Sequence, residues 1–318
     1  MAQLGVILIA GPTASGKSAL ATTLAERAGG VVVNADSMQV YRELQLLTAR
    51  PSAADEMRVP HRLYGHIPAS DAYSAGRFAK DAQCVIAEAW RASQIPIIVG
   101  GTGLYFSVLL DGLSPVPAIP ADIRAQWRET SERLDGSALH EELARVDPVM
   151  ARRLPTSDRQ RIVRALEVIT ATGRSLASWQ SEPGAPVVPR ESPVLPVVVT
   201  RERAEIYARC DARFAKMVEM GALDEVRRLL ALELDPGLPA MRALGVRPLA
   251  RHLTGQIDLD TAISQGQTET RNYVKRQLTW LRRNMIAWNS INLSEMNSSE
   301  ALSFLNINEW IDRCRRAR

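Results

Sequence analysis

Long apolar runs separated by polar segments dominate the first hundred residues. They occur at residues 6–10, 31–33 and 95–99. Apolar residues with helical spacing follow the first run, and a second helical pattern, at residues 75–93, precedes the third run. A continuous apolar run is typical of a strand buried in a parallel sheet, whereas apolar residues three and four apart indicate a helix. The pattern predicts an α/β fold in which helices flank a parallel sheet.

The pattern changes between residues 114 and 196. Three prolines interrupt the chain, four helical segments follow at 121–133, 137–146, 148–154 and 158–172, and a proline-rich stretch precedes an apolar run at 197–199 that resumes the sheet. Further helices are expected at 203–232 and near 299–316, with an edge strand at 285–288. We therefore predict a core domain of residues 1–113 and 197–318 and an all-helical insertion domain of residues 114–196.

The composition is that of a soluble globular protein, with 318 residues of which 46% are hydrophobic and 23% charged. We expect no membrane span, because no apolar stretch reaches the roughly 20 residues that cross a bilayer, and no secretion signal. The cysteines are widely spaced, as expected of free thiols in a reducing cytoplasm. The histidines form no convincing metal set. These residues are Cys84, Cys210, Cys314, His61, His66, His140 and His252.

The net charge is only +4, but just four of the 39 basic residues are lysines. Guanidinium groups bind phosphates in a forked geometry and stack on bases, so the excess of arginine is compatible with a nucleic-acid partner. A genome-wide arginine bias gives the same composition. The positions of the arginines therefore carry more weight than their number.

A phosphate-binding motif lies between the first predicted strand and the first predicted helix: Gly11-Pro12-Thr13-Ala14-Ser15-Gly16-Lys17-Ser18. In such a P-loop, glycines let successive backbone N–H groups point at one anion, and the helix N-terminus adds positive charge. Lys17 would bind the outer phosphates and the Ser18 hydroxyl a magnesium ion. The alternative, a Gly/Ser loop that only caps a helix, does not explain the flanking strand. We predict a diphosphate or triphosphate site.

Two further candidates follow predicted strands. Asp36 comes after the run at 31–33, and Thr102 lies in Gly100-Gly101-Thr102-Gly103 after the run at 95–99. Open α/β sheets bind ligands at this end of the strands. Asp36 either faces the substrate or caps a helix, and the glycine-rich segment with Thr102 is often only a tight turn. Neither strand ends in the magnesium-binding acidic residue of P-loop ATPases and GTPases, which favours a transferase over a hydrolase.

Basic residues cluster in three segments, of which the first two are predicted helices. Arg161 and Arg164 share one helix face, whereas Ile162 and Val163 point toward a core; a solvated face is the usual meaning of such charges. Arg209 and Arg213 are spaced four apart on one face. A third cluster surrounds aromatic residues, as in an RNA-binding groove, and contains Arg271, Tyr273, Lys275, Arg276, Gln277, Trp280, Arg282 and Arg283.

The ordered set of motifs resembles the bacterial tRNA dimethylallyltransferases. The matching stretches cover the chain from about residue 4 to residue 283, and two segments depart from the family pattern. The family usually has Gly-Thr-Ala-Lys-Pro at residues 47–51 and Gly-Tyr-Lys/Arg-Glu/Gln at residues 245–248. The matches are Gly11–Ser18, Asp36-Ser37-x-Gln39-x-Tyr41, Pro60-His61-Arg62-Leu63, Gly100-Gly101-Thr102-Gly103-Leu104-Tyr105, the segment 160–167 and the segment 275–282.

The resemblance implies transfer of a dimethylallyl group from dimethylallyl diphosphate to N6 of the adenosine next to the anticodon, at position 37, in tRNAs that read codons beginning with U. It implies that the P-loop holds the diphosphate with Mg²⁺, and that Lys17 and Arg213 stabilise it. Asp36 would accept the amine proton and Thr102 would position it or the diphosphate. A cytoplasmic monomer is expected.

The resemblance also implies that the helical insertion binds the anticodon stem-loop. The residues implied in tRNA binding are Asp36, Ser37, Met38, Gln39, Thr102, Arg124, Gln160, Arg161, Ile162, Val163, Arg164, Arg242, Arg247, Lys275 and Arg276. Three other functions share parts of the pattern: a prenyltransferase for free adenine nucleotides, a P-loop kinase for small molecules, and a non-catalytic RNA-binding protein. The insertion and the 275–283 cluster argue against the first, the Gly-Gly-Thr-Gly turn against the second, and intact Lys17 and Asp36 against the third.

Overall fold

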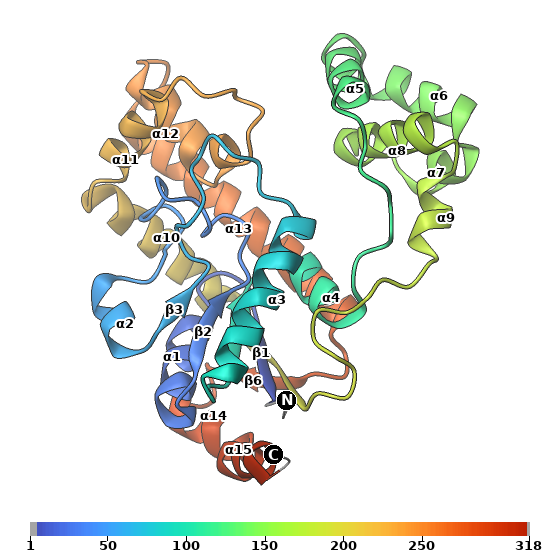
Figure 1. Ribbon diagram of the computed structural model, residues 1–318. Coiled ribbons are helices and arrows are strands. Elements are labelled where there is room, and N and C mark those ends of the chain that lie inside the picture. Colours follow the sequence, from blue (N-terminus) through green and yellow to red (C-terminus); the bar gives the residue numbers. More distant parts are fainter. Residues whose placement is uncertain (1–4, 317–318) are drawn as a thin grey trace. The chain divides into compact units, whose positions relative to one another are not determined.

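The computed structural model describes residues 5–316, so residues 1–4 and 317–318 of the expected core domain lie outside the described residues. The chain forms two compact units, one with the sheet and the other, Asp111–Pro186, made of helices and loops (Figure 1). The second unit is shorter than the predicted insertion 114–196 at its C-terminal end. Val188 N donates to Leu109 O at 2.9 Å, and the next strand already begins at Val194.

The first unit is built on a six-stranded sheet in the order β3-β2-β4-β1-β5-β6, in which all described strands are parallel. β1 lies at its centre, with Ile9 in register with Val99 on one side and Val197 on the other. The last strand is at Asn289–Asn292, not at the predicted 285–288. The strands are β1 Val6–Ala10, β2 Val31–Asn34, β3 His61–Arg62, β4 Pro96–Gly100, β5 Val194–Thr200 and β6 Asn289–Asn292.

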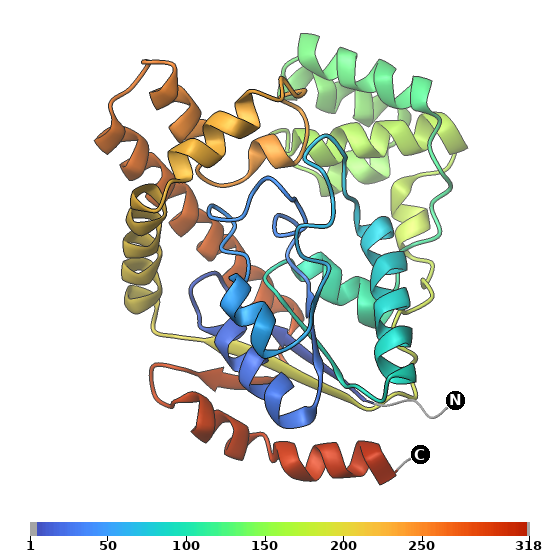
Figure 2. The same ribbon diagram turned by 60° about the vertical axis from the view of Figure 1, so that its left-hand side comes forward.

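Helices cover both faces of the sheet. One face packs against α1 (Lys17–Ala28), α14 (Ser298–Phe304) and α15 (Ile307–Arg316), which share one hydrophobic core with alternate residues of β1, β4 and β5 (Figure 2). α3 (Ala75–Arg91) contacts β2 and β4. Phe78 of α3 stacks on Tyr105 of α4 (Gly103–Asp111), with the ring centroids 3.9 Å apart.

A helical layer follows β5 and carries much of the candidate site. α10 (Arg203–Glu219) packs along α13 (Leu259–Asn284) through Ile206, Cys210 and Val274. The single helix predicted at 203–232 is wrong, because Gly221 adopts φ 105° and separates α10 from the next helix. α13 carries the whole basic-aromatic cluster of residues 271–283. The remaining elements of this unit are α2 Ala53–Arg58, α11 Ala222–Leu230, the 3₁₀ turn Ala240–Arg242 and α12 Val246–Leu253.

The second unit is a small helical bundle with its own core. Leu139, Leu143, Ile162 and Leu166 are fully buried in it. Aspartates cap three of its helices; Asp158, for example, accepts a hydrogen bond from Arg161 N at the start of α8. Among residues 5–316, no helix is both long and apolar enough to cross a bilayer. The helices are α5 Ala121–Arg133, α6 Gly136–Val146, α7 Pro148–Arg153, α8 Arg159–Thr172 and α9 Leu176–Gln180.

Candidate active site

The P-loop leaves the end of β1 and enters α1 as the sequence predicted. Gly16 sits at the N-cap of α1 with φ 97°, a conformation that favours glycine. Ser15 N donates to Pro12 O at 3.3 Å, and Lys17 Nζ donates to the same carbonyl at 3.1 Å. The hydroxyl of Ser15 is fully buried and has no hydrogen-bond partner within residues 5–316. The loop thus forms a closed turn in which the Ser15 hydroxyl has no hydrogen-bond partner among the described residues.

Two arginines of α10 hold the P-loop from one side. Arg213 donates to the Thr13 hydroxyl, and Arg209 Nε donates to Ala14 O at 3.0 Å. Their spacing of four residues puts both guanidinium groups on one face of the helix. Only Arg213 was predicted as a site residue, although the same spacing identified Arg209 as its neighbour. With Lys17, three basic side chains therefore lie at one loop.

Gln277 of α13 joins the P-loop to the glycine-rich turn after β4. Its Oε1 accepts a hydrogen bond from Thr13 N at 2.9 Å, and its Nε2 donates to Gly101 O at 3.0 Å. A Cβ atom on Gly101 would lie 2.1 Å from that amide nitrogen, and one on Gly103 would lie 2.3 Å from the ring of Trp280. These glycines are therefore required for the close approach of α13.

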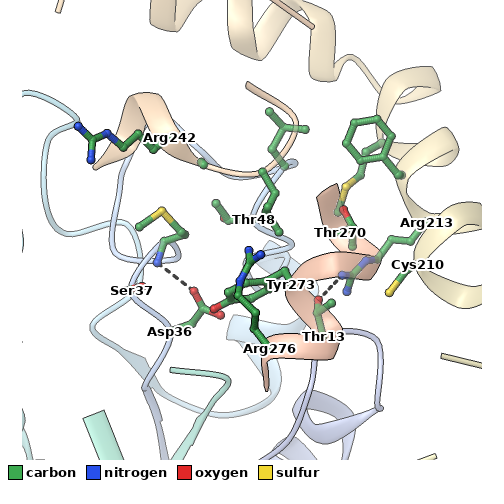
Figure 3. Close-up of a pocket in the computed structure, with 16 residues that line it drawn as sticks. Thr13, Asp36, Ser37, Thr48, Cys210, Arg213, Arg242, Thr270, Tyr273 and Arg276 are labelled. Atoms are coloured by element: carbon green, nitrogen blue, oxygen red, sulfur yellow. Dashed lines mark hydrogen bonds between the residues drawn. The ribbon is translucent and has the colours of Figure 1, made fainter. Parts of the chain in front are cut away.

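Asp36 lies in a tight turn at the end of β2. Its backbone N–H donates to Asn34 Oδ1 at 2.8 Å, and its Oδ1 accepts from Met38 N at 2.9 Å (Figure 3). The helix-cap alternative for Asp36 is wrong, because the next helix, α2, begins at Ala53 with Ser52 as its cap. One carboxylate oxygen orients the turn, and within residues 5–316 the second oxygen accepts no hydrogen bond.

Thr102 supports this turn from the end of β4. Its Oγ1 accepts a hydrogen bond from Ser37 N at 3.0 Å, while its own N–H donates to Ala35 O at 3.2 Å. Thr102 lines neither of the cavities described below. In this structure it therefore acts on the Asp36 turn through Ser37.

Two adjoining cavities open at the carboxyl ends of the strands. The larger, about 450 Å³, contains the P-loop face with Lys17 and Ser18. The smaller, about 230 Å³, has polar residues on one side and apolar residues from α10 on the other. Figure 3 shows Asp36 and Arg213 reaching into the smaller cavity from different elements. The two cavities share four lining residues: Thr13, Asp36, Thr48 and Arg213.

The charges at the P-loop depend on burial. Desolvation lowers the pKa of Lys17 to about 8, the Asp36 carboxylate opposes this shift, and the Arg213 guanidinium adds to it. Burial likewise lowers the pKa of Arg213. Burial removes the water that stabilises these two positive charges. The charges at the P-loop therefore favour an anionic ligand, because its negative charge stabilises them in place of the water.

Comparison with known proteins decides the family. A family model described as IPP transferase matches residues 39–284, more than half of the chain. The chain belongs to the IPP transferase family. A tRNA dimethylallyltransferase of Parvibaculum lavamentivorans is 51% identical over 302 residues, covering 94% of this chain and 95% of its own. One from Paramagnetospirillum magneticum is 50% identical and covers 96% of each chain.

Solved structures agree with this assignment. The tRNA isopentenylpyrophosphate transferase of Bacillus halodurans has a TM-score of 0.70 at 29% identity, over 99% of each chain. A eukaryotic dimethylallyltransferase acting on tRNA has a TM-score of 0.80 at 27% identity, over 95% of this chain and 78% of its own. The α/β fold predicted from the apolar runs is therefore the fold of the IPP transferases.

The IPP transferase site gathers many, not all, of the residues predicted from the sequence. Lys275 and Arg247 are exposed and line neither cavity. Arg276 and Arg242 are also exposed but do line the smaller one, where Arg276 lies over the Tyr273 ring at 5.5 Å. The predicted residues that line a cavity are Thr13, Ala14, Gly16, Lys17, Ser18, Asp36, Ser37, Met38, Gln39, Arg213, Arg242 and Arg276.

In the second unit, the predicted tRNA-binding residues divide by burial. Arg124 of α5 and Gln160, Arg161 and Arg164 of α8 are exposed, whereas Ile162 is fully buried in the core of the unit. The Ile162 side chain is thus a core residue, and only its backbone is left for a contact with RNA. Val163 is half-buried against the same core.

A magnesium ion fits the donor chemistry only with help from a ligand. No group of three or more histidine, cysteine or carboxylate side chains in the described part of the chain forms a metal site. Ser18 and Asp36 line the larger cavity together. Mg²⁺ keeps several waters and is often held by one or two protein groups plus substrate phosphates. The residues present suit an ion that arrives with a diphosphate.

Of the polar side chains that hold the site together, Gln277, Tyr273 and Arg209 are three that were not predicted as site residues. Gln277 and Tyr273 had been noted only as members of a basic-aromatic cluster, and Arg209 only as the helix neighbour of Arg213. Their roles depend on contacts across 176 to 264 residues of sequence for Gln277 and 195 for Arg209. The usable signal for Gln277 was its place inside the family stretch at residues 275–282.

Proposed function

We propose that this IPP transferase transfers the dimethylallyl group of dimethylallyl diphosphate to N6 of adenosine 37, next to the anticodon, in tRNAs that read codons beginning with U. The names of its relatives support the reaction class. The observation that carries the proposal is the position of Asp36, whose side chain lines both the P-loop cavity and the smaller cavity beside it. This position supports a role for Asp36 as the base between the diphosphate and the acceptor.

The leaving group is bound at the P-loop. As the allylic C–O bond breaks, negative charge grows on the diphosphate, and Lys17, Arg209 and Arg213 lie around the loop that would hold it. Preorganised charges of this kind stabilise a transition state without having to reorganise. Mg²⁺ bound at Ser18, when present, would neutralise further charge on the diphosphate.

Asp36 would complete the transfer. The allylic carbon gains positive character and forms a bond with N6 of adenine, the amine proton passes to the free carboxylate oxygen of Asp36, and diphosphate departs. Asn34 and Thr102 fix the turn that orients Asp36, through hydrogen bonds to Asp36 N and Ser37 N. General-base catalysis of this type contributes about 10²–10⁴-fold.

The acceptor would reach this site as an unstacked base. Extruding a nucleotide costs a few kcal/mol, offset by contacts to the base and its neighbours. Arg242, Tyr273 and Arg276 lie at the smaller cavity and offer stacking and phosphate contacts. We assign the exposed arginines of α8, with Arg124, Arg247 and Lys275, to the phosphates of the anticodon stem-loop. Cytoplasmic location and a monomeric state stay predictions.

The test is transfer of label from dimethylallyl diphosphate, with Mg²⁺, to an unmodified tRNA whose anticodon is followed by adenosines. Asp36→Ala should lower the turnover by about 10²–10⁴-fold, and the matched variant Asp312→Ala, at an exposed carboxylate of α15, should retain it. Label at the anticodon-adjacent adenosine supports the proposal. Label found only on free AMP or ATP would contradict an RNA acceptor while leaving prenyl transfer intact.

A further inference from the structure

The smaller cavity has an apolar side whose role the reaction alone does not explain. Phe214 and Met217 of α10 form part of it, together with Leu47 and Leu244. Phe214 follows Arg213 directly, and Met217 lies one helical turn further along. One segment of α10 therefore supplies both Arg213, which contacts the P-loop, and part of the apolar surface. A diphosphate held at Arg213 has this surface within reach of its hydrocarbon chain.

Leu47 closes that apolar side in a fixed position. Its side chain is 9% exposed, and its Cδ2 is so close to Gly245 that even a Cβ atom there would approach it to 3.1 Å. Phe214 lies against the same glycine, at 2.6 Å from that Cβ position. Packing from behind leaves Leu47 little room to withdraw from a longer ligand.

The loop that carries Leu47 is held by a buried carboxylate. Glu225 of α11 is only 4% exposed, and it accepts three backbone hydrogen bonds from consecutive residues. Its Oε2 accepts from Gln45 N and Leu46 N, both at 2.8 Å, and its Oε1 accepts from Leu47 N at 2.9 Å. Hydrogen bonds to a buried charged group are among the stronger ones in proteins. Glu225 therefore fixes the backbone at Leu47 itself.

Two more side chains restrain the same loop from the opposite direction. Gln39 Nε2 donates to Thr48 O at 2.8 Å and to Ala49 O at 3.1 Å. Arg50 Nη1 donates to Tyr41 O at 3.0 Å, which ties the end of the loop to the turn that follows Asp36. A wall restrained in this way discriminates ligand length better than a mobile loop.

We propose that Leu47 sets the upper length of the prenyl chain that the enzyme accepts, and that Glu225 is a positioning residue that holds Leu47 in place. The inference rests on the function proposed above and adds its substrate limit: a five-carbon allylic diphosphate is used in preference to a ten-carbon one. The bonds are the same for both donors. The allylic C–O bond breaks, the C–N6 bond forms, the proton goes to Asp36 and diphosphate leaves.

The first experiment is a competition for unmodified tRNA between equal amounts of dimethylallyl diphosphate and geranyl diphosphate, with the nucleoside products separated by mass. Leu47→Ala should raise the ratio of geranyl to dimethylallyl product by about 10-fold or more, the lower range for added methylenes in an apolar pocket. Leu47→Phe should lower kcat/KM for dimethylallyl diphosphate. Leu232→Ala, at an exposed leucine, is the matched control and should match the wild type.

The second experiment separates positioning from direct contact. Glu225→Gln should raise the same product ratio while the KM for tRNA stays unchanged, because the amide cannot accept all three N–H groups. Combining it with Leu47→Ala should add little, since residues that act through one another are not additive. A full additional rise in the double variant would overturn the positioning role. Thermal unfolding of each variant establishes that it is folded.

The outcomes distinguish this inference from the proposed function. An unchanged product ratio in a folded Leu47→Ala variant that still modifies tRNA would overturn the length limit and leave the reaction standing. A raised KM for tRNA with an unchanged product ratio would place the adenine, not the prenyl chain, against Leu47, and would also overturn it. If the wild type transfers neither group to tRNA, the proposed function fails, and this inference fails with it.

Discussion

The P-loop and helix α8 both carry the basic side chains that we assign to phosphates, but these side chains are held in different ways. At the P-loop, Arg209 and Arg213 are fixed by hydrogen bonds to residues of a distant element. On α8, Arg161 and Arg164 are exposed, and among the described residues 5–316 they form ion pairs only with carboxylates three residues away, on the same helix or at its cap. The first arrangement is preorganised for one small anion. The second is an adaptable charged surface.

This difference predicts where binding energy is concentrated. A preorganised site loses most of its function when one member is removed, because the others cannot move to replace it. Exposed ion pairs contribute little individually and are screened by salt. Single substitutions should therefore have large effects at the P-loop and small ones on α8.

Lys17→Ala should have the largest effect. Without the ammonium group the developing charge on the diphosphate loses a close partner, and kcat/KM for dimethylallyl diphosphate should fall by about 10³-fold. The dissociation constant for tRNA, measured by filter binding, should stay within a few fold. Lys80→Ala, an exposed lysine of α3, is the control. A loss of tRNA affinity as large as the loss in kcat/KM would show that the P-loop and the tRNA-binding surface do not act independently.

Gln277→Ala should come next. The substitution removes the hydrogen bonds to Thr13 N and Gly101 O at once, and a small displacement of the P-loop should lower kcat by about 100-fold. Leaving buried groups unpaired should also reduce the free energy of unfolding by about 2 kcal/mol. Steady-state kinetics and urea denaturation measure the two effects. Gln265→Ala on the same helix should show neither; a normal kcat in Gln277→Ala would refute the bridging role.

Binding of dimethylallyl diphosphate without tRNA should weaken as the pH rises above about 8. Burial lowers the pKa of Lys17 to about 8, so the free enzyme loses this charge above that pH. The ligand then has to bring a proton back, and its dissociation constant should rise by up to about 10-fold per pH unit. Calorimetry from pH 7 to pH 9.5 measures it. Lys17→Arg should flatten the profile, and a profile that is unchanged in this variant would contradict the assignment.

Arg161→Ala should have the smallest effect. One exposed arginine lost from a phosphate-contacting surface should raise the KM for tRNA by about threefold and reduce the slope of log K against log salt by about 1. Titrations at several salt concentrations measure both quantities. Arg145→Ala in α6 of the same unit is the matched control. A 100-fold rise in the KM for tRNA would show that α8 is preorganised like the P-loop.

The sequence predicted what depends on local chemistry. β1, β2 and β4 are fully buried along their length, so their apolar runs stood out. The P-loop was recognisable because its glycines and Lys17 serve a conformation confined to eight residues. Helices α5 to α8 of the second unit were also predicted to within a few residues, since each alternates between its own core and solvent, whereas the five-residue α9 was not predicted.

The rest depends on distant contacts. β6 was misplaced because only Ile291 of its four residues is buried, so an edge strand of this kind has no apolar run. Gly266 lies inside α13, where Phe214 fills the space that a Cβ would occupy, at 2.1 Å, so its role depends on a residue more than fifty positions away. Gln277 is similar: its two partners lie in loops that only the folded sheet brings together.

The strand order also bears on how the chain folds during synthesis. The first strand made occupies the centre of the sheet, and one of its neighbours, β5, pairs Val194 with Val6. About 190 residues have to be translated between them, which takes about 10–40 s at usual ribosomal rates. Until then the fully apolar β1 has at least one unpaired edge, because β4 supplies the other neighbour, and an unpaired edge is a recognised aggregation hazard. The helical unit is translated before β5 and has a core of its own to fold around. The nascent chain is therefore partly compact before β1 has both of its neighbouring strands.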